Sequence, residues 1–537
     1  MRSGVGNVNA DKVPWLAADP RSWRTVFWVA WAVVLVARIG LAATLAPFGD
    51  EAWYWQESRA LDWSFSDLPP ATALLIRLGE AVFGHGVLAM RSLFLLAGAL
   101  LPLVVLRIGR RVFDPAAGYA AALLTLALPL LGTLGILALP DVPLTLASAC
   151  ALDALERATR TRRLRDWAGL GMALAVAWLC HYRTAMLLLT GLTFLCLAWR
   201  GRALWSDPGL WLALAIACLG LIPLLVFNVE HNWVALGFQL VERNPWAFHA
   251  DALVQPLEQA LVCTPLFYLL LLWCAWQGLR RVHDGGPWDV FALCAIVPIV
   301  VYFVLGCFAD DTRFRAHWPL PGYVPLLVML PVLLRAQTAT RQRRFALVAA
   351  LGLLILGDAL AFGYLAMAAV PRGAGVLARM KAFPEHFVGW REAAAQTQAL
   401  LSQPRFRDAV LVADNFMLAA ELDFALDGKS PVYSLDHPLN AKHGRAAQLA
   451  LWQRDEAGLR KLGPRRVLLL AEPTARRERE REAWMQGLCA RIDGLTRVYA
   501  LDIYEGRKRY RWFSGTVPAG SAAADGIHIQ ECDAASP

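Results

Sequence analysis

Charge is scarce in this sequence of 537 residues. Asp, Glu, Lys and Arg make up 18% of it and hydrophobic residues 57%, whereas roughly a quarter of an average soluble domain is charged. This balance excludes a disordered chain and a coiled coil. The length also exceeds the roughly 250–300 residues at which a single hydrophobic core stops growing. We therefore expect a membrane protein rather than one soluble domain.

Cysteine motifs are lacking as well, because none of the ten Cys residues stands in a C-x-x-C pair or another metal-like spacing. This argues against a zinc module and a disulfide scaffold. Cys489 and Cys532 could form a single disulfide if the C-terminal part is exported. The net charge of +9 would suit a nucleic-acid binder, but such a protein does not need so much apolar surface, so we expect no nucleic-acid partner.

Long apolar runs are present instead. The first, about 25–47, is too long for the apolar core of a signal peptide and has no clear cleavage site. A membrane helix needs about 20 apolar residues, and further candidates lie near 87–106, 116–138, 142–156, 167–181, 184–199, 208–229, 256–278, 287–308, 318–334 and 345–370. The sequence predicts a polytopic α-helical membrane protein with about eleven spans, in a range of 10–13.

The composition changes near residue 370. Residues 1–370 hold 28 Lys or Arg and 23 Asp or Glu, and the much shorter 371–537 holds 24 and 20. We predict a cytoplasmic N-terminus (1–24), a transmembrane domain with outside loops (25–370) and a soluble domain (371–537).

The soluble part has the pattern of an α/β domain. Short apolar runs at 409–412, 431–435 and 466–470 are typical of strands, residues 417–426 of a helix, and a charged helix is expected from Thr474.

Basic residues orient the predicted spans. If the N-terminus is cytoplasmic, twenty Lys and Arg fall in inside segments and seven in outside segments. The positive-inside rule supports this orientation, and an odd number of spans then places residues 371–537 outside the cytoplasm.

Unusual polar residues gather in the outside segments. Asp50 and Glu51 follow directly on the first span; as a helix N-cap and a first-turn acid they would be structural, but a partly desolvated carboxylate is also suited to be a general base. Asp141 lies at the same membrane level, between two prolines that stiffen the turn. His181, Tyr182 and Arg183 follow in otherwise apolar sequence.

Arginine near the bilayer is costly unless it reaches water or an anion, and a lipid phosphate suits a guanidinium. Arg313 and Arg315 are further candidates for such a contact, although solvated loop charges are the simpler interpretation. Asn228 and His231 lie in another outside segment, and Trp318 is most simply an interfacial anchor. No histidine stands in a ligand-spaced motif, so no cofactor is expected with certainty and a divalent metal ion stays open.

Several of these segments resemble a known family. The runs D-E-A-W-Y-W (50–55), L-D-W (61–63) and D-L-P-P (67–70) resemble the first external loop of bacterial glycosyltransferase family 39-type enzymes. These are relatives of the dolichyl-phosphate-mannose–protein mannosyltransferases and of the lipid A aminoarabinose transferases, and they have the GT-C fold. Where members often have Tyr and His, this chain has Trp53 and Leu68. Similar motifs surround Asp141, residues 181–183, 227–239 and 317–323, and the resemblance covers roughly residues 35–515.

The resemblance implies an integral membrane glycosyltransferase of the bacterial inner membrane that uses a polyprenyl-phosphate-linked sugar. The sugar faces the periplasm, its phosphate is the leaving group, and the acceptor is lipid A, lipopolysaccharide or another envelope glycoconjugate. Asp50 is then the base, Glu51 its helper and Asp141 a second carboxylate. The other candidates, for donor phosphate or substrate binding, are His181, Tyr182, Arg183, Asn228, His231, Arg313, Arg315 and Trp318.

Three other functions stay open at this point. The resemblance also fits transfer of a sugar to protein Ser or Thr, as in protein O-mannosyltransferases. A transporter or flippase of a lipid-linked substrate would instead carry ionisable residues deep in its spans, and within the predicted spans only Arg38 is clearly deep, while the polar residues cluster at loop positions. In a membrane-anchored binding protein, residues 371–537 would carry the function.

Overall fold

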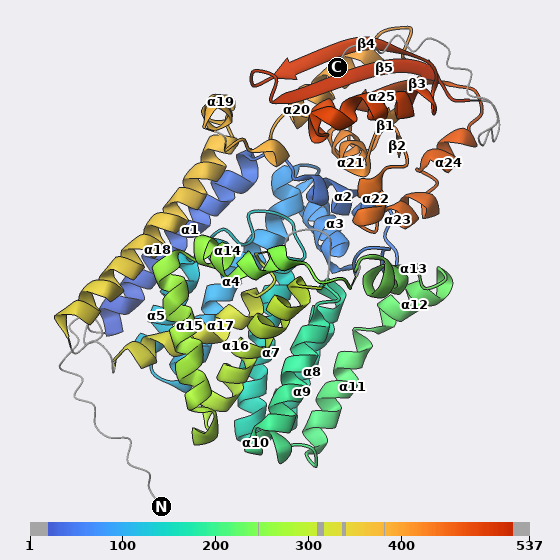
Figure 1. Cartoon of the computed structure of the whole chain (residues 1–537). Coiled ribbons are helices and arrows are strands. Elements are labelled where there is room, and N and C mark those ends of the chain that lie inside the picture. The colour runs from blue at the N-terminus through green and yellow to red at the C-terminus, as the bar shows by residue number, and fades with distance from the viewer. Residues whose placement is uncertain (1–19, 245, 309–315, 336–339, 381, 519–537) are drawn as a thin grey trace, which may run out of the picture.

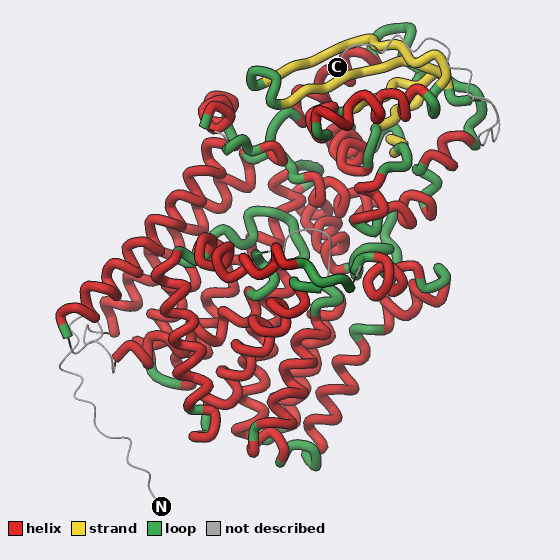
Figure 2. The backbone as a smooth tube through the Cα atoms, in the orientation of Figure 1, coloured by secondary structure: helices red, strands yellow, loops and turns green. Residues whose placement is uncertain are grey.

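The computed structural model describes residues 20–244, 246–308, 316–335, 340–380 and 382–518. Within these ranges the chain is helical up to residue 409, and strands occur only beyond it (Figures 1 and 2). The two halves differ in structure as they differ in composition.

Long helices, some of them broken, form the body of the molecule (Figure 1). In chain order they are α1 (Pro20–Thr44), α2 (Gly49–Arg59), α3 (Ala71–Phe83), α4 (Val87–Val112), α5 (Pro115–Ala127), α6 (Pro129–Gly132), α7 (Asp141–Thr161), α8 (Leu164–Cys180), α9 (Thr184–Leu197), α10 (Trp199–Arg202), α11 (Pro208–Leu219), α12 (Ile222–Glu230), α13 (Val234–Gly237), η2 (Phe238–Glu242), η3 (Ala250–Val254), α14 (Gln255–Val262), α15 (Pro265–Arg280), η4 (Val282–Asp284), α16 (Pro287–Gly306), α17 (Leu320–Arg335) and α18 (Arg341–Ala368). Each apolar run predicted to be a span coincides with one of these helices or with two consecutive ones.

Among the described residues, four helices are long and apolar enough to cross a membrane: α1, α4, α16 and α18. The number rises to six if each of the bent pairs α11–α12 and α14–α15 is one span, and α5, α9 and α17 are shorter apolar helices. The chain is a polytopic helical membrane protein, and the total of about eleven spans remains a prediction.

Two predicted spans are bent by proline. The run 256–278 breaks between α14 and α15, whose axes differ by 110°, because Thr264 has a positive φ of 65° and Pro265 opens the next helix. The run 208–229 bends by 40° between α11 and α12. Proline lacks the N–H that would continue the preceding helix, so it favours such a restart.

The deep Arg38 of α1 is satisfied by backbone. Its guanidinium donates to the carbonyl oxygens of Leu131 and Gly132, at 2.7 Å each. These carbonyls belong to α6, directly after the chain breaks at Pro129. The carbonyl groups of this short helix thus bind the buried guanidinium.

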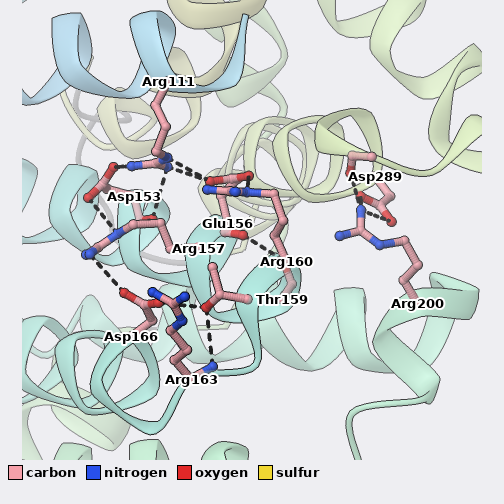
Figure 3. Close-up of polar contacts among 12 residues, drawn as sticks. Arg111, Asp153, Glu156, Arg157, Thr159, Arg160, Arg163, Asp166, Arg200 and Asp289 are labelled. Carbon is pink, nitrogen blue, oxygen red and sulfur yellow. Dashed lines mark hydrogen bonds and ion pairs between the residues drawn. The ribbon is translucent and has the colours of Figure 1, made fainter.

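A network of ion pairs joins the ends of α4, α7 and α8 (Figure 3). Arg111 of α4 pairs with Asp153 and Glu156 of α7, and Arg157 reaches Asp166 of α8 at 2.9 Å. Its α7 residues lie about 18–24 Å from the first residue of that helix, at 1.5 Å per helical residue. This end carries many of the arginines that the positive-inside rule assigned to the cytoplasm.

The C-terminal part, beyond α18, combines short helices with a sheet (Figure 2). Its elements are α19 (Pro371–Arg379), η5 (Glu385–Phe387), α20 (Trp390–Leu401), β1 (Val410–Ala413), α21 (Phe416–Ala425), β2 (Val432–Ser434), α22 (Pro438–Lys442), α23 (Ala446–Leu451), α24 (Glu456–Arg460), β3 (Arg466–Ala471), η6 (Pro473–Ala475), η7 (Glu478–Glu480), α25 (Arg481–Cys489), β4 (Asp493–Ile503) and β5 (Lys508–Thr516). The three strands predicted from the sequence correspond to β1, β2 and β3. The helix expected from Thr474 begins later, at Arg481, after two turns of 3₁₀ helix. Cys532 lies outside the described residues.

The sheet has the order β2-β1-β3-β5-β4. Strands β2, β1 and β3 run parallel to one another, β5 is antiparallel to β3, and β4 is antiparallel to β5. Side chains of its central strands alternate between two cores. Leu411 packs with Leu418 and Trp512 on one face, while Val412 packs with Leu488 on the other. Burial on both faces is typical of parallel strands and explains their short, continuous apolar runs.

The C-terminal domain is docked on the segment that follows α1 through α21, which packs against α2. Gln56 of α2 donates to Asp423 of α21 at 2.7 Å, and the backbone N–H of Ser66 donates to Gln448 at 2.9 Å. Trp53 packs beside Phe416 of this domain. The segment predicted to carry the chemistry therefore lies between the two parts of the molecule.

Candidate active site

A cavity of about 290 Å³ opens where the helix bundle meets the C-terminal domain. Its walls come from the start of α2, the loop after it, the turns before α7 and α9, η2, the segment before α17 and the residues between α22 and α23. Five residues predicted from the sequence line it: Asp50, Asp141, His181, Arg183 and Trp318. They come from segments far apart in the chain, so the folded structure brings two of the three predicted carboxylates and one predicted arginine together.

Asp50 is paired with an arginine that the sequence did not single out. Arg445, directly before α23, donates from Nη1 to Asp50 Oδ1 at 2.7 Å and from Nε to Asp67 Oδ2 at 3.2 Å. Its guanidinium carbon lies 4.3 Å from the ring centre of Phe416 and 5.2 Å from that of Trp53. Burial acts to lower the pKa of Arg445, but the charges of Asp50 and Asp67 raise it, so the guanidinium stays charged.

Asp141 and Arg183 form a second carboxylate–arginine pair in the cavity. His317 Nε2 lies 3.6 Å from the same carboxylate oxygen. Burial would raise the pKa of Asp141, but the positive charges of Arg183 and His317 hold it well below its usual range. Burial, followed by the charge of Arg183, lowers the pKa of His181, so its imidazole is neutral at physiological pH.

A third acidic group lies behind Asp50. Glu57, about two turns further along α2, is buried and accepts a hydrogen bond from Trp53 Nε1 at 2.8 Å. Burial and the neighbouring charge of Asp67 raise the pKa of Glu57 well above its ordinary value. Asp50, Asp67 and Glu57 thus share one region, and Arg445 is the cation that offsets them there.

Glu51, the predicted helper, does not line the cavity. Its side chain is fully buried and accepts hydrogen bonds from Arg91 of α4, Nε to Oε1 at 2.8 Å and Nη2 to Oε2 at 2.6 Å. The backbone N–H groups of Phe48 and Ala138 also donate hydrogen bonds to this carboxylate, at 2.9 and 2.6 Å. Glu51 therefore fixes the start of α2 against α4 and the turn before α7.

Asn228 and His231 also lie away from the cavity lining. Asn228 is buried and ties two helices, because it donates to the Leu224 carbonyl and accepts from the N–H of Leu236. His231 is held by the Phe227 carbonyl at 2.9 Å. Both make contacts that shape α12 and α13.

Of the other predicted residues, Tyr182 is not among the lining residues, and burial raises its pKa to about 12. Trp318 is in the lining, and the guanidinium carbon of Arg243 lies 5.9 Å from its ring centre. Arg313 and Arg315 lie outside the described residues, so their role as phosphate ligands stays a prediction.

Sequence reasoning missed the contribution of the C-terminal domain. Lys442, His443 and Arg445 line the cavity, yet in the sequence they look like ordinary surface charges. Gly444 in their midst has a φ of +74°, and a Cβ there would lie 2.5 Å from the ring of Phe238. A glycine between basic residues is the local signal that this loop is packed closely against another part of the protein.

Within the described residues, no group of three or more His, Cys, Asp or Glu is arranged to hold a metal ion. The cavity combines aspartates with neutral and basic side chains, and two carboxylate–arginine pairs lie in it. Such a site can bind an anion and hold a carboxylate next to it.

Comparison with known proteins gives a consistent result. The profile of the dolichyl-phosphate-mannose-protein mannosyltransferase family matches residues 67–227. The lipid A galacturonosyltransferase RgtD of Rhizobium johnstonii is 23% identical over 401 residues, which cover 72% of this chain and 79% of that protein. An undecaprenyl phosphate-α-4-amino-4-deoxy-L-arabinose arabinosyl transferase of Pseudomonas aeruginosa is 28% identical over 329 residues, or 55% of this chain and 56% of that protein.

Among solved structures, ArnT of Cupriavidus metallidurans bound to undecaprenyl phosphate superposes with a TM-score of 0.63 at 17% identity. The match covers 91% of this chain and 98% of ArnT, so it includes the C-terminal domain. The relatives are glycosyltransferases by name, which confirms the enzyme class and the membrane character predicted from the sequence. The chain therefore has the fold of ArnT, and its resemblance to the GT-C glycosyltransferases of the family 39 type, first indicated by the external loop, is confirmed.

Proposed function

We propose that this protein moves a sugar from a polyprenyl-phosphate donor to an acceptor in the bacterial envelope, lipid A or lipopolysaccharide first of all. The observation that carries the proposal is the cavity in which Asp50 and Asp141 lie among arginines at one end of a membrane helix bundle. Two of the relatives are named for transfer to lipid A or for an undecaprenyl-phosphate-linked sugar.

The donor phosphate has suitable ligands. Arg183 and Arg243 lie in the cavity wall of the membrane domain, and Lys442 comes from the C-terminal domain. Guanidinium groups bind phosphate oxygens through two parallel hydrogen bonds, and an ammonium acts as a point charge. We assign the leaving phosphate to this basic side of the cavity.

A second, apolar cavity supports a polyprenyl donor. It has a volume of about 480 Å³ and lies among α7, α8, α9, α11, α16 and α17. Its lining includes Ser148, Leu187 and Pro321. These residues follow Asp141, Arg183 and Trp318 of the polar cavity in the chain. At 1.5 Å per helical residue, each lies about 10 Å or less further along. A lipid phosphate could therefore lie in the polar cavity with its first prenyl units in the apolar one.

The chemistry follows from the two carboxylates. Asp50 takes the proton of the acceptor hydroxyl, whose oxygen forms a bond to the anomeric carbon of the sugar. The bond between that carbon and the phosphate oxygen breaks, and the polyprenyl phosphate leaves with the bonding electrons. Positive charge fixed near that oxygen stabilises the transition state. Asp141, kept ionised by Arg183, orients this arginine toward the phosphate.

We also propose the topology predicted from the sequence: about eleven spans, a cytoplasmic N-terminus and a periplasmic domain at 371–537. The ion-pair network of Figure 3 supports it, because its arginines lie at the end of α7 remote from the cavity. Alkaline phosphatase fused after residue 537 should be active, since this reporter folds only outside the cytoplasm. An inactive fusion in a correctly inserted protein would contradict the orientation.

The function is tested by the Asp50→Asn variant in a deletion strain. The wild-type gene should restore a sugar on lipid A or another envelope glycolipid in mass spectra, whereas the variant should lose about 10²–10⁴-fold in transfer rate, as expected for loss of a general base. Asp62→Asn, in the exposed part of the same loop, is the matched control and should transfer normally. Full transfer by Asp50→Asn would refute the assignment of the base. A sugar found on periplasmic protein Ser or Thr instead would favour the O-mannosyltransferase-like activity that the matching family's description suggests.

A further inference from the structure

The C-terminal domain approaches the cavity with one buried arginine. The side chain of Arg445 is 3% exposed, while that of Asp50, its partner at 2.7 Å, is 18% exposed. Both residues line the cavity, and Asp50 is the more exposed of the two. The pair crosses the boundary between the two parts of the protein.

The backbone of Arg445 is fixed by its own domain. Its N–H donates to the carbonyl of Asn440 at 2.8 Å, and its carbonyl accepts from Leu449 in the first turn of α23. Asn440 in turn is buried, donates to Ser434 and Leu435 at the end of β2, and accepts from the N–H of Phe416 at 3.0 Å. The edge of the sheet therefore dictates where the guanidinium lies.

The carboxyl groups around Asp50 need this cation. Glu57 and Asp67 lie on the same side, Tyr54 of α2 faces the same space, and Lys442 and His443 accompany Arg445 from the C-terminal domain. Asp141 on the opposite wall has its own partner in Arg183. Without Arg445, three neighbouring carboxyl groups in a buried site would lose the arginine beside them, and Asp50 would no longer face an opposite charge at 2.7 Å.

Holding the domains together does not depend on this arginine. Gln56 binds Asp423, the Ser66 N–H binds Gln448, and the Ser66 hydroxyl donates to the Gly444 carbonyl at 2.6 Å. These contacts remain when Arg445 is replaced. What is lost is the charge beside Asp50.

Resting on the proposed function, we infer that Arg445 is a positioning residue by which the C-terminal domain completes the active site: it holds Asp50 ionised and in place to accept the proton of the acceptor hydroxyl. The membrane domain then supplies the base, and the C-terminal domain sets the protonation state of that base. The domain outside the helix bundle is part of the catalytic apparatus and not only a platform for the acceptor.

The test is the pH dependence of sugar transfer in membranes from strains carrying the wild type, Arg445→Gln or Arg445→Lys. An adjacent opposite charge lowers the pKa of an aspartate by about 1–3 units. The acidic limb of the Arg445→Gln profile should therefore move upward by about 1–3 pH units, activity should recover toward alkaline pH, and Arg445→Lys should restore part of the shift. Arg454→Gln, which removes another arginine of this domain that pairs with Asp423, should keep the wild-type profile.

A second measurement does not need turnover. In purified full-length protein, the carboxyl C=O stretching band lost in Asp50→Asn can be titrated by infrared difference spectroscopy, and its midpoint should be higher in Arg445→Gln than in the wild type. An unchanged midpoint overturns the inference. So does a loss of transfer that is uniform over all pH values, or an equal shift in Arg454→Gln, since each would mean that Arg445 serves only domain docking. Absence of any sugar transfer by the wild type would instead refute the proposed function, while the titration still decides the role of Arg445.

Discussion

Replacing Glu51 by Gln separates architecture from chemistry in the acidic pair of the first external segment. In the folded protein both carboxylate oxygens of Glu51 accept two hydrogen bonds, and its partner Arg91 is also fully buried. Glutamine would place an amide N–H₂ against two donors and remove the negative charge. Breaking a buried ion pair on one side costs about 3–5 kcal/mol.

The lower end of that range is expected, because Arg91 keeps other acceptors. It also donates to the carbonyls of Ala42, Leu45 and Ala46 at 2.8–3.0 Å. The free energy of unfolding should therefore fall by about 3 kcal/mol. Tryptophan fluorescence of the purified protein during thermal unfolding in detergent measures the change.

The control is Asp62→Asn in the exposed part of the same loop, which should unfold like the wild type. The reasoning is refuted if Glu51→Gln unfolds at the wild-type temperature but no longer transfers sugar, since Glu51 would then act in the chemistry rather than in the fold.

Two further predictions concern the C-terminal domain. Gly444→Ala should reduce transfer by about 10²-fold, the order expected for a misplacement of 1 Å, because the added Cβ would overlap the ring of Phe238 and displace the basic loop. Rates of transfer in membranes check this. Burial, followed by the charge of Glu472, raises the pKa of Asp414 to about 7, above the value of about 3.9 in an unfolded chain. The folded state therefore binds the proton more tightly, stability falls as pH rises from about 4 to 7, and it is constant above. Thermal unfolding of Asp414→Asn should lack this fall, with a higher midpoint than the wild type at pH 7.5 and an equal one at pH 4.

Each of these has its own control. Gly463 also has a positive φ, of 72°, but nothing lies within 4 Å of a Cβ there, so Gly463→Ala reports backbone strain alone and should keep its transfer rate. Equal losses in the two alanine variants would exclude the contact with Phe238 as the cause. If the pH dependence of stability between pH 4 and 7 is the same in the wild type and in Asp414→Asn, the pKa of Asp414 is not raised in the folded domain.

The helical half of the fold could be predicted to a large extent. Each long apolar run is a helix because a segment that avoids water must satisfy its own backbone. Bends at Pro265 and Pro223 were not predicted, since hydropathy records the length of an apolar run and not its direction. In the C-terminal domain, β1, β2 and β3 were visible as short apolar runs because they are buried on both faces, whereas β4, with many exposed residues, was not.

In the candidate site, the adjacent acids Asp50 and Glu51 have different surroundings, and helix geometry explains why. Successive residues of an α-helix point about 100° apart, so Asp50 and Glu51 point in different directions. Asp50 faces the cavity, and Glu51 turns toward α4. Asn228 and His231 share a motif with cavity residues yet bind backbone groups, because a motif preserves a local turn as well as a chemical role.

The sequence by itself determined that this is a helical membrane protein with a distinct C-terminal domain, and it indicated Asp50, Asp141 and Arg183 as residues of one site. Apolar run length and local motif are enough for those conclusions. Only the tertiary structure decided that Glu51 is buried against Arg91 and that Arg445 completes the cavity. The partner of a buried charge depends on which segments the fold brings within about 3 Å, the reach of a hydrogen bond, and residues 50 and 445 are joined only through the docking of a sheet edge on a helix bundle.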